Sequence, residues 1–468
     1  MGIMDVYTGR YTTKERVRDG VFSWVADGHG NPRLYQRGSM SKTIWHLLSP
    51  GEMTNEVIRE VRLGDLDDTF IPQGFGENTD ELLYFDRHEG RMALYAMNLA
   101  GEDRSSRLVY THPRVDVASL HRLGKYDRMV GVVYAEETIH FDYFDEVIRQ
   151  IYDAIKANFP NDNVVILDED WNQRYYLAAI TSDTNPGTYY RFDRQENKLA
   201  RIGPLYSSLK DKELSRMSII GYTARDGTAI PAYLSLPVSG EKAGLPAVIL
   251  PHGGPSSRDV WDYNFLVQYL TAKGYAVLQS NYRGSGGYGK AWEGDGAFRN
   301  WRTAIDDIAD GAQYLVKEGI ANPNRICAVG WSFGGYAALM SGIEEPDRYR
   351  CIASIAGVTD PQKLGLNMRR FVGGKSAQTF IGTDDEVTVR GSPVNRAAEI
   401  QDPVLLVHAE KDINVPFKQG ELMYEALQKH GKSVEFITYE NAEHSILPER
   451  YRIDLLTRLG EFLDQHTR

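Results

Sequence analysis

The chain has 468 residues, of which 42% are hydrophobic and 25% are charged. A chain of this length exceeds what one hydrophobic core usually supports, so we expect two domains. The formal net charge is −11. This charge argues against a partner such as nucleic acid or an anionic membrane, because binding either would need clustered Lys and Arg.

No segment of the sequence predicts a membrane span or a signal peptide. The N-terminal stretch has no apolar run of the required length, and no run of about 18 apolar residues occurs anywhere in the chain. We therefore predict a cytoplasmic protein that does not bind membranes; the alternative is that a targeting segment precedes this chain.

The two cysteines, Cys327 and Cys351, both lie in apolar, strand-like runs. Two cysteines are too few for a disulfide framework, and free cysteine is among the most buried residue types. We predict two buried free thiols. No His or Cys pair has the spacing of metal ligands, so the sequence implies neither a metal nor another cofactor.

Residues 1–210 consist mainly of short alternating runs joined by polar turns, which predict β-hairpins. The strand pairs begin near residues 21, 81, 128 and 174, and this loose spacing of about 45 is typical of β-propeller blades. At that spacing the segment makes about four or five blades. One stretch, DEVIRQIYDAIKANFP, has apolar residues at helical spacing and predicts a helix among the strands.

Residues 211–468 follow a different pattern, in which apolar strand-like runs alternate with helical ones. Continuous apolar strands separated by helices predict a mostly parallel, doubly wound sheet with both faces covered. The fold class is therefore α/β for this domain and partial β-propeller for the first. Helices are expected near residues 262–273, 302–318, 334–343, 417–430 and 450–465.

The run ICAVGWSFGGYAAL predicts a strand, a glycine-rich turn and a helix in succession. It contains the G-x-S-x-G pattern of a nucleophile elbow in the structural context that this pattern demands. A Cβ at Gly330 or Gly334 would clash in so tight a turn. We predict that Ser332 is a nucleophile, held in a strained conformation at the N-terminus of a helix.

A serine nucleophile needs a histidine to accept its proton and a carboxylate to orient that histidine. In this fold the order along the chain is Ser, acid, His. Of the histidines that follow Ser332, we choose His444, in the loop after the last predicted strand, over three others: His408, His430 and His466. The loop HAEKDINVP offers Glu410 and Asp412, and we favour Asp412 because it lies deeper in the loop.

Negative charge that forms on a substrate oxygen needs hydrogen-bond donors, and we expect the backbone N–H groups of Phe333 and Gly254 to supply them. Gly254 lies in the loop ILPHGGPSSRD, whose glycines allow close backbone approach. We expect His252 of the same loop, Phe333 and the stretch from Gly357 to Phe371 to line the substrate pocket, with Tyr336 and Phe371 as named contacts. An aromatic side chain near a nucleophile is as often core as pocket, so core packing is the alternative for the last two.

These features together resemble the prolyl oligopeptidase family of serine peptidases, and most of all its acylaminoacyl-peptidase and dipeptidyl-peptidase-like branch. The similar stretches run in the family's order through nearly all of residues 215–468: TARDGTAIPAYLSLP, LPHGGP, GYAVLQSNYRGSGGYG, GWSFGGYAAL, SPVNRAAEIQDPVLLVHAEKD and YENAEH. The resemblance implies an α/β-hydrolase domain capped by a seven-bladed propeller. It also implies a triad of Ser332, Asp412 and His444, with an oxyanion hole formed by the N–H groups of Gly254 and Phe333.

The sequence departs from the family at three points. His252 stands where prolyl oligopeptidases and dipeptidyl peptidases have a tyrosine, and Ala409 stands where glycine is usual. Four or five blades are fewer than seven, so the propeller is either naturally short or lacks its first blades. A propeller that does not close exposes strand edges, which would favour a homo-oligomer.

We predict a serine hydrolase that acts through an acyl-enzyme on short peptides. One alternative is a carboxylesterase, because the same triad hydrolyses small esters. A further alternative, from another class, is a binding protein that uses its propeller and carries a relic hydrolase domain. The complete set of Ser332, Asp412, His444 and HGGP argues against the relic, which would be free to lose any of them.

Overall fold

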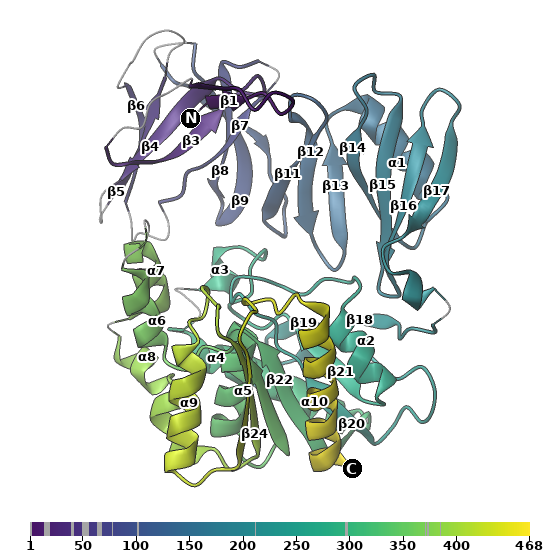
Figure 1. The fold of residues 1–468 in the computed structure, drawn as a ribbon, viewed down its shortest axis with the longest axis vertical. Helices are drawn as coiled ribbons and strands as arrows, with labels where there is room; N and C mark the ends of the chain where they lie inside the picture. The colour runs from purple at the N-terminus through teal and green to yellow at the C-terminus, as the bar shows by residue number, and fades with distance from the viewer. Residues whose placement is uncertain are drawn as a thin grey trace.

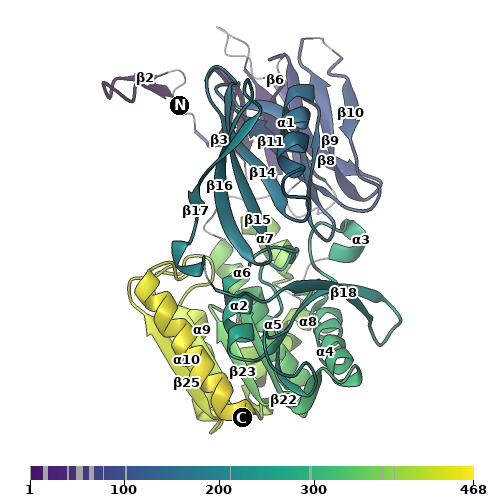
Figure 2. The same ribbon diagram turned by 90° about the vertical axis from the view of Figure 1, so that its right-hand side faces the viewer.

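The computed structural model shows an all-β domain above an α/β domain (Figure 1). In the α/β domain, helices lie on both sides of the sheet (Figure 2). Among the described residues, no helix is long and apolar enough to cross a bilayer. The structure describes residues 2–13, 19–38, 42–48, 56–62, 68–76, 78–100, 103–210, 212–294, 298–369, 371, 374–383 and 385–468.

The described part of the N-terminal domain contains four small antiparallel sheets and a separate two-stranded ribbon. Consecutive sheets touch along their strands, with β3 against β7, β9 against β11 and β11 against β14. This arrangement is that of propeller blades, as the strand spacing predicts. The ribbon is β1 (Gly2–Met4) and β2 (Tyr11–Thr13), and the blades are β3 (Val21–Ala26), β4 (Pro32–Gly38), β5 (Lys42–Leu47) and β6 (Glu56–Arg62); β7 (Ile71–Phe75), β8 (Glu81–His88), β9 (Arg91–Asn98) and β10 (Ser106–Tyr110); β11 (Val117–Leu123), β12 (Arg128–Ala135) and β13 (Ile139–Tyr143); and β14 (Asn163–Glu169), β15 (Tyr175–Ser182), β16 (Asn185–Asp193) and β17 (Lys198–Pro204).

The helix predicted among these strands is confirmed as α1 (Glu146–Lys156). Asp145 caps its N-terminus by accepting hydrogen bonds from two backbone N–H groups, which leaves fewer donors without a partner at the helix start. The helix follows the three-stranded blade, and its apolar face packs on the core shared with the next blade. Three isoleucines form that face: Ile148, Ile151 and Ile155.

The C-terminal domain is built on one eight-stranded sheet in the order β18-β19-β21-β20-β22-β23-β24-β25. The strands from β21 to β25 are parallel, whereas β18 and β19 run antiparallel to their neighbours. The strands are β18 (Met217–Thr223), β19 (Ala229–Ser235), β20 (Leu245–Ile249), β21 (Ala276–Ser280), β22 (Ala321–Trp331), β23 (Cys351–Ile355), β24 (Val404–Ala409) and β25 (Val434–Tyr439).

Helices cover both faces of this sheet, so its central strands are buried on both sides. Along β20, Ala247 and Ile249 point to one core and Val248 to the other, as the alternation of side chains along a strand requires. Side chains of α4, α5 and α9 fill the first core and side chains of α2 and α10 fill the second. The helices are α2 (Phe265–Ala272), α3 (Lys290–Glu293), α4 (Trp301–Lys317), α5 (Phe333–Glu344), α6 (Pro361–Met368), α7 (Gly374–Ile381), α8 (Glu386–Arg390), α9 (Lys418–Lys429) and α10 (Glu449–Thr467), with 3₁₀ turns at Ser207–Leu209 and Pro393–Glu399.

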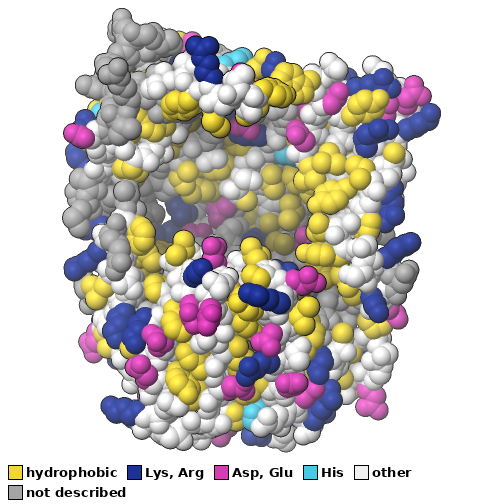
Figure 3. Space-filling model, in the orientation of Figure 1, with side chains coloured by type: hydrophobic (Ala, Val, Ile, Leu, Met, Phe, Trp, Pro, Cys, Tyr) yellow, Lys and Arg dark blue, Asp and Glu magenta, His cyan; other side chains and the backbone are white. Residues whose placement is uncertain are grey.

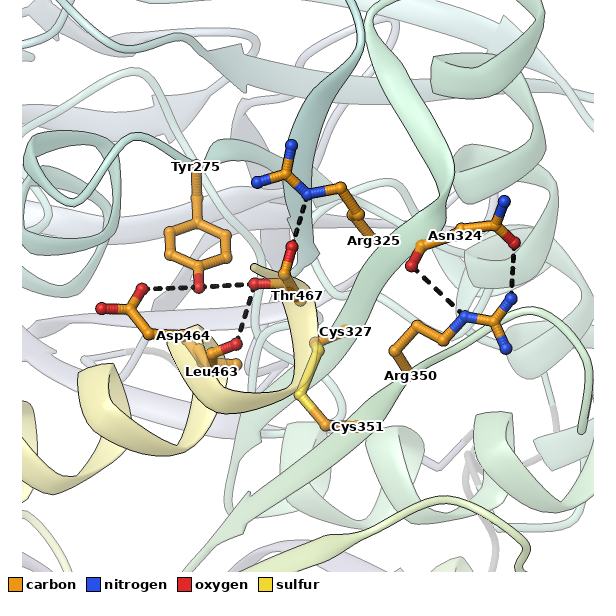
Figure 4. The surroundings of a disulfide bond; sticks show 9 residues. All are labelled: Tyr275, Asn324, Arg325, Cys327, Arg350, Cys351, Leu463, Asp464 and Thr467. Carbon is orange, nitrogen blue, oxygen red and sulfur yellow. Dashed lines mark hydrogen bonds between the residues drawn. A yellow bond between two sulfur atoms is a disulfide. The ribbon is translucent and has the colours of Figure 1, made fainter.

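The prediction of two free thiols is wrong, because Cys327 and Cys351 form a disulfide (Figure 4). Both residues are fully buried, as expected, but they are also direct partners in the register of β22 and β23. Their Cα atoms lie 4.8 Å apart, within the range that a disulfide spans. A count of cysteines could not reveal this pairing, since it depends on which strands become neighbours.

Loops of the α/β domain, together with Tyr233 of β19, hold the propeller through hydrogen bonds to its backbone and to the carboxylate of Asp116. Arg258 Nη1 donates to Ala135 O at 2.9 Å, and the Tyr233 hydroxyl donates to Glu137 O at 2.9 Å. The N–H of Gly289 donates to the carboxylate of Asp116 at 3.0 Å. Most of these loops follow β20 and β21, so the carboxyl edge of the sheet faces the propeller.

Asp259 lies in the same loop as Arg258 and is half-buried, with its Oδ2 atom shielded from solvent. Its Oδ1 accepts a hydrogen bond from Gln279 Nε2 at 2.7 Å, whereas its Oδ2 has no partner among the described residues. Burial raises the pKa of Asp259 to about 7, and the contacts with Gln279 and Arg258 offset only part of this effect. The folded protein therefore binds a proton here that the unfolded chain releases near pH 4.

Replacing this acid by its amide should change how stability depends on pH. Because the folded pKa lies above the unfolded one, Asp259 costs the least stability below about pH 4 and progressively more up to about pH 7. We expect Asp259→Asn to gain about 2–4 kcal/mol of unfolding free energy over wild type between pH 4 and pH 8. Urea unfolding of both proteins at the two pH values measures this gain, and an equal difference at both would contradict it.

Candidate active site

Ser332 lies at the junction between β22 and α5, at the carboxyl edge of the sheet. Its φ of +61° places it in the left-handed region, where residues other than glycine are uncommon. The turn is fixed from the neighbouring strand, because Ser332 N donates to Ile355 O at 2.8 Å. Strained backbone of this kind persists where surrounding structure holds it, and it concentrates at functional sites.

Two glycines make this turn possible by leaving room for backbone. A Cβ at Gly330 would lie 2.0 Å from Gly334 O, and a Cβ at Gly334 would lie 2.1 Å from Pro251 O. Both contacts are to backbone atoms, which cannot move aside as a flexible side chain can. Residue Pro251 begins the HGGP loop, so the close approach at Gly334 also brings that loop against the serine turn.

His444 and Asp412 form a close pair next to this turn. His444 Nδ1 lies 2.7 Å from Asp412 Oδ2. The other carboxylate oxygen, Oδ1, accepts hydrogen bonds from the backbone N–H groups of Asn414 and Val415, each at 2.9 Å. Because an ionised carboxylate can only accept, Nδ1 carries the proton, which leaves Nε2 of the same ring available as an acceptor.

The carboxyl group of Asp412 is held ionised. Burial by itself would raise its pKa, but the contacts with His408 and His444 and the hydrogen bond from Val415 N outweigh burial and lower the pKa of Asp412 to about 2. Glu410, the other acid considered from the sequence, is exposed. The negative charge next to the His444 ring therefore comes from Asp412.

Trp331 connects the serine turn to the histidine loop. Its indole Nε1 donates to His444 O at 2.9 Å, which fixes the backbone of His444 relative to the end of β22. Sequence reasoning assigned no role to this tryptophan. The signal was present in its position next to the serine, but its partner lies 113 residues away in the chain.

Ser332 and His444 line the same cavity, which has a volume of about 570 Å³. Among the described residues, no hydrogen bond joins the Ser332 hydroxyl to the His444 ring; in unliganded enzymes such bonds are often long and shorten when substrate binds. The described lining contains no Asp, Glu, Lys or Arg. It consists of Gly253, Gly254, Pro255, Phe298, Trp331, Ser332, Phe333, Val358, Leu364, Asn414, Val415 and His444.

Both residues expected to supply oxyanion donors, Gly254 and Phe333, line this cavity. Three expected substrate contacts do not: His252, Tyr336 and Phe371. His252 instead stacks on Tyr282 with ring centroids 4.4 Å apart, and its Nε2 lies 2.8 Å from Ser285 Oγ. Tyr336 is fully buried in the core beneath α5, and Phe371 is 58% exposed in the loop after α6.

The apolar wall of the cavity comes from segments far apart in the sequence. Phe298 precedes α4, Val358 and Leu364 follow β23, and Val415 follows the Asp412 loop. Val358 and Leu364 belong to the stretch from Gly357 to Phe371 that is expected from the sequence to line the pocket, whereas Phe298 and Asn414 carry no sequence pattern that marks them. Above this domain, a hollow separates it from the propeller, and hydrophobic side chains show at the back of the hollow (Figure 3).

Comparisons with known proteins show which family and which folds this chain is similar to. The sequence profile of the prolyl oligopeptidase family matches residues 261–468. The chain is 28% identical over 385 residues to dipeptidyl aminopeptidase BIII of Pseudoxanthomonas mexicana. The aligned region covers 77% of this chain and 54% of that protein. The chain thus spans about half the length of this curated relative.

Solved structures share the whole fold. A puromycin-hydrolyzing peptidase of Mycobacterium tuberculosis matches with a TM-score of 0.75 and 20% identity, over 98% of this chain and 72% of that one. An acylaminoacyl peptidase of Pyrococcus horikoshii matches with a TM-score of 0.74 and 17% identity, over 99% of this chain and 73% of that one. The chain thus resembles the prolyl oligopeptidase family, in the sequence of its C-terminal domain and in its overall fold.

Proposed function

We propose that this protein is a serine peptidase that cleaves short peptides through an acyl-enzyme. The observation that carries the proposal is the buried, ionised Asp412 bound to His444, on a cavity that also contains the strained Ser332. This arrangement supplies the three groups that activate a serine hydroxyl. The family of the C-terminal domain supports the same reaction class.

In the proposed mechanism, Ser332 Oγ attacks the carbonyl carbon of the scissile bond while His444 Nε2 takes the hydroxyl proton. Asp412 stabilises the imidazolium that forms, and it keeps the Nδ1 proton directed at itself. The N–H groups of Phe333 and Gly254 donate to the oxygen that becomes negative. His444 then gives its proton to the leaving amine, and a water molecule releases the acyl group by the same steps in reverse order.

The cavity favours a hydrophobic residue on the amino side of the scissile bond. Its wall is apolar and its described lining has no charged side chain that could pair with a charged substrate residue. Placing an unpaired charge in such a pocket costs several kcal/mol, whereas an aromatic or aliphatic side chain gains from burial. We therefore propose substrates with Phe, Tyr or Leu at this position.

The first test is turnover of N-blocked tripeptide p-nitroanilides with Phe or Leu before the scissile amide. Wild type should hydrolyse them and react with a fluorophosphonate probe. Ser332→Ala should abolish labelling and lower turnover at least about 10³-fold with an unchanged melting temperature, because only the nucleophile is lost. Hydrolysis of matched esters without the amides would indicate a carboxylesterase, and a protein that neither labels nor hydrolyses would indicate a binding protein.

The assignment of the acid can be tested with two isosteric amides. Asp412→Asn should lower kcat by roughly 10³ to 10⁴, because the amide carries no negative charge to stabilise the imidazolium and its NH₂ group can hold His444 in the wrong tautomer. Glu410→Gln, in the same loop but exposed, should cost less than tenfold. The measurement is kcat on the best peptide substrate, and the opposite ranking would assign the role to Glu410.

The pocket proposal can be tested on one helix, α6, with Leu364 as the test position and Leu366 as the control. Leu364 is 7% exposed and lines the cavity, whereas Leu366 is 45% exposed and does not. Leu364→Ala should lower the kcat/KM ratio of Phe over Ala substrates about 5- to 30-fold through lost apolar contact. Leu366→Ala should leave that ratio unchanged, and equal effects from both variants would place the substrate elsewhere.

A further inference from the structure

A second histidine lies against the carboxylate of Asp412. His408 is on β24, four residues before Asp412, and its side chain is only 2% exposed. Its Nε2 lies 2.8 Å from the backbone oxygen of Val415. A carbonyl oxygen can only accept a hydrogen bond, so Nε2 of His408 carries a proton and donates it.

That N–H group also faces the candidate acid. His408 Nε2 lies 3.5 Å from Asp412 Oδ2, the oxygen that binds His444 Nδ1. This distance is long for a hydrogen bond, so the contact is mainly an electrostatic attraction between the N–H dipole and the carboxylate. In a buried site such an attraction is screened less than it would be in water.

Val415 completes a closed arrangement around Asp412. Its backbone oxygen accepts from His408 and its backbone nitrogen donates to Asp412 Oδ1 at 2.9 Å. His408 therefore acts on both carboxylate oxygens of Asp412. It attracts Oδ2 directly, and it holds the Val415 backbone whose N–H donates to Oδ1. Because Val415 also lines the cavity, His408 links the position of the acid to the wall of the pocket.

The ring of His408 has little freedom to turn. A Cβ at Gly420, on α9, would lie 2.9 Å from His408 Nδ1, which shows how closely the helix backbone packs on the ring. The ring of Phe417 meets it edge-on, with centroids 5.9 Å apart. Close packing from α9 therefore fixes the direction in which Nε2 donates.

We propose that His408 is a positioning residue, which holds the loop of Asp412 so that its carboxylate faces His444. This inference rests on the proposed peptidase function, since it assigns His408 a part in setting kcat. The alternative is a purely structural role, in which His408 stabilises the fold and affects turnover only through the amount of folded protein. The two roles predict different values of kcat for a variant that still folds but lacks the Nε2 donor. A positioning role predicts a lower kcat, and a purely structural role predicts an unchanged kcat.

Three substitutions separate these cases by the reach of their side chains. In His408→Gln the amide nitrogen can take the place of Nε2 and donate to Val415 O. His408→Asn presents the same amide group one methylene closer to the backbone, and His408→Leu has no donor. His430→Gln, at the exposed end of α9, is the control for the substitution itself.

We expect the Asn and Leu variants to lose about 10- to 100-fold in kcat with KM within about threefold of wild type, because small misplacement of catalytic groups is costly in rate. The Gln variant should retain kcat within about fivefold, as should His430→Gln. Rates are expressed per folded site, counted by circular dichroism and by stoichiometric labelling with fluorophosphonate. Asn and Leu variants that fold and keep wild-type kcat would overturn the proposal.

A measurement on wild type covers the case in which neither the Asn nor the Leu variant folds. In protein labelled with ¹⁵N-histidine, the resonance that disappears in His408→Gln should come from a ring protonated at Nε2. A ring protonated only at Nδ1 would overturn the proposal, since it could not donate to Val415 O. Wild type that neither labels nor hydrolyses peptides would instead refute the proposed function and leave this tautomer result intact.

Discussion

The structure of the site depends on one steric constraint, the contact of backbone with backbone around Ser332. The end of β22, the start of α5 and the HGGP loop meet so closely that a Cβ at Gly330 or Gly334 would overlap a carbonyl group. The constraint leaves Ser332 in a left-handed conformation, with the HGGP loop packed against its turn. One set of contacts therefore brings the serine and the glycine N–H groups of the neighbouring loop to the same cavity.

The second organising feature is a buried carboxylate that remains ionised. Asp412 lies in a region where burial alone would favour the protonated form, and hydrogen bonds to its charged form reverse that preference. The backbone N–H groups of Asn414 and Val415 and the His444 ring are the donors, and the N–H of His408 lies close by. A buried charge with several partners is held in one direction, which is the property that an orienting acid needs.

The two domains meet at the edge of the sheet that carries these groups. Arg258, in the loop after β20, and Tyr233, on β19, donate to backbone carbonyls at the β12–β13 turn, so the propeller stands over the site rather than beside it. The hollow between the domains lies along this edge (Figure 3).

The sequence by itself determined the features that depend on local pattern: the parallel sheet and its helices from alternating apolar runs, α1 from its helical spacing, and the strained turn from its glycines. It also ranked Asp412 over Glu410 by their depth in one loop, and the structure places Asp412 against His444. Only the tertiary structure decided the pairing of Cys327 with Cys351, the contact of Trp331 with His444, and the removal of Tyr336 from the pocket. Each of these depends on strand register or on which face of a helix meets the core, and such relations join residues that are distant in the chain and leave no periodic trace in it.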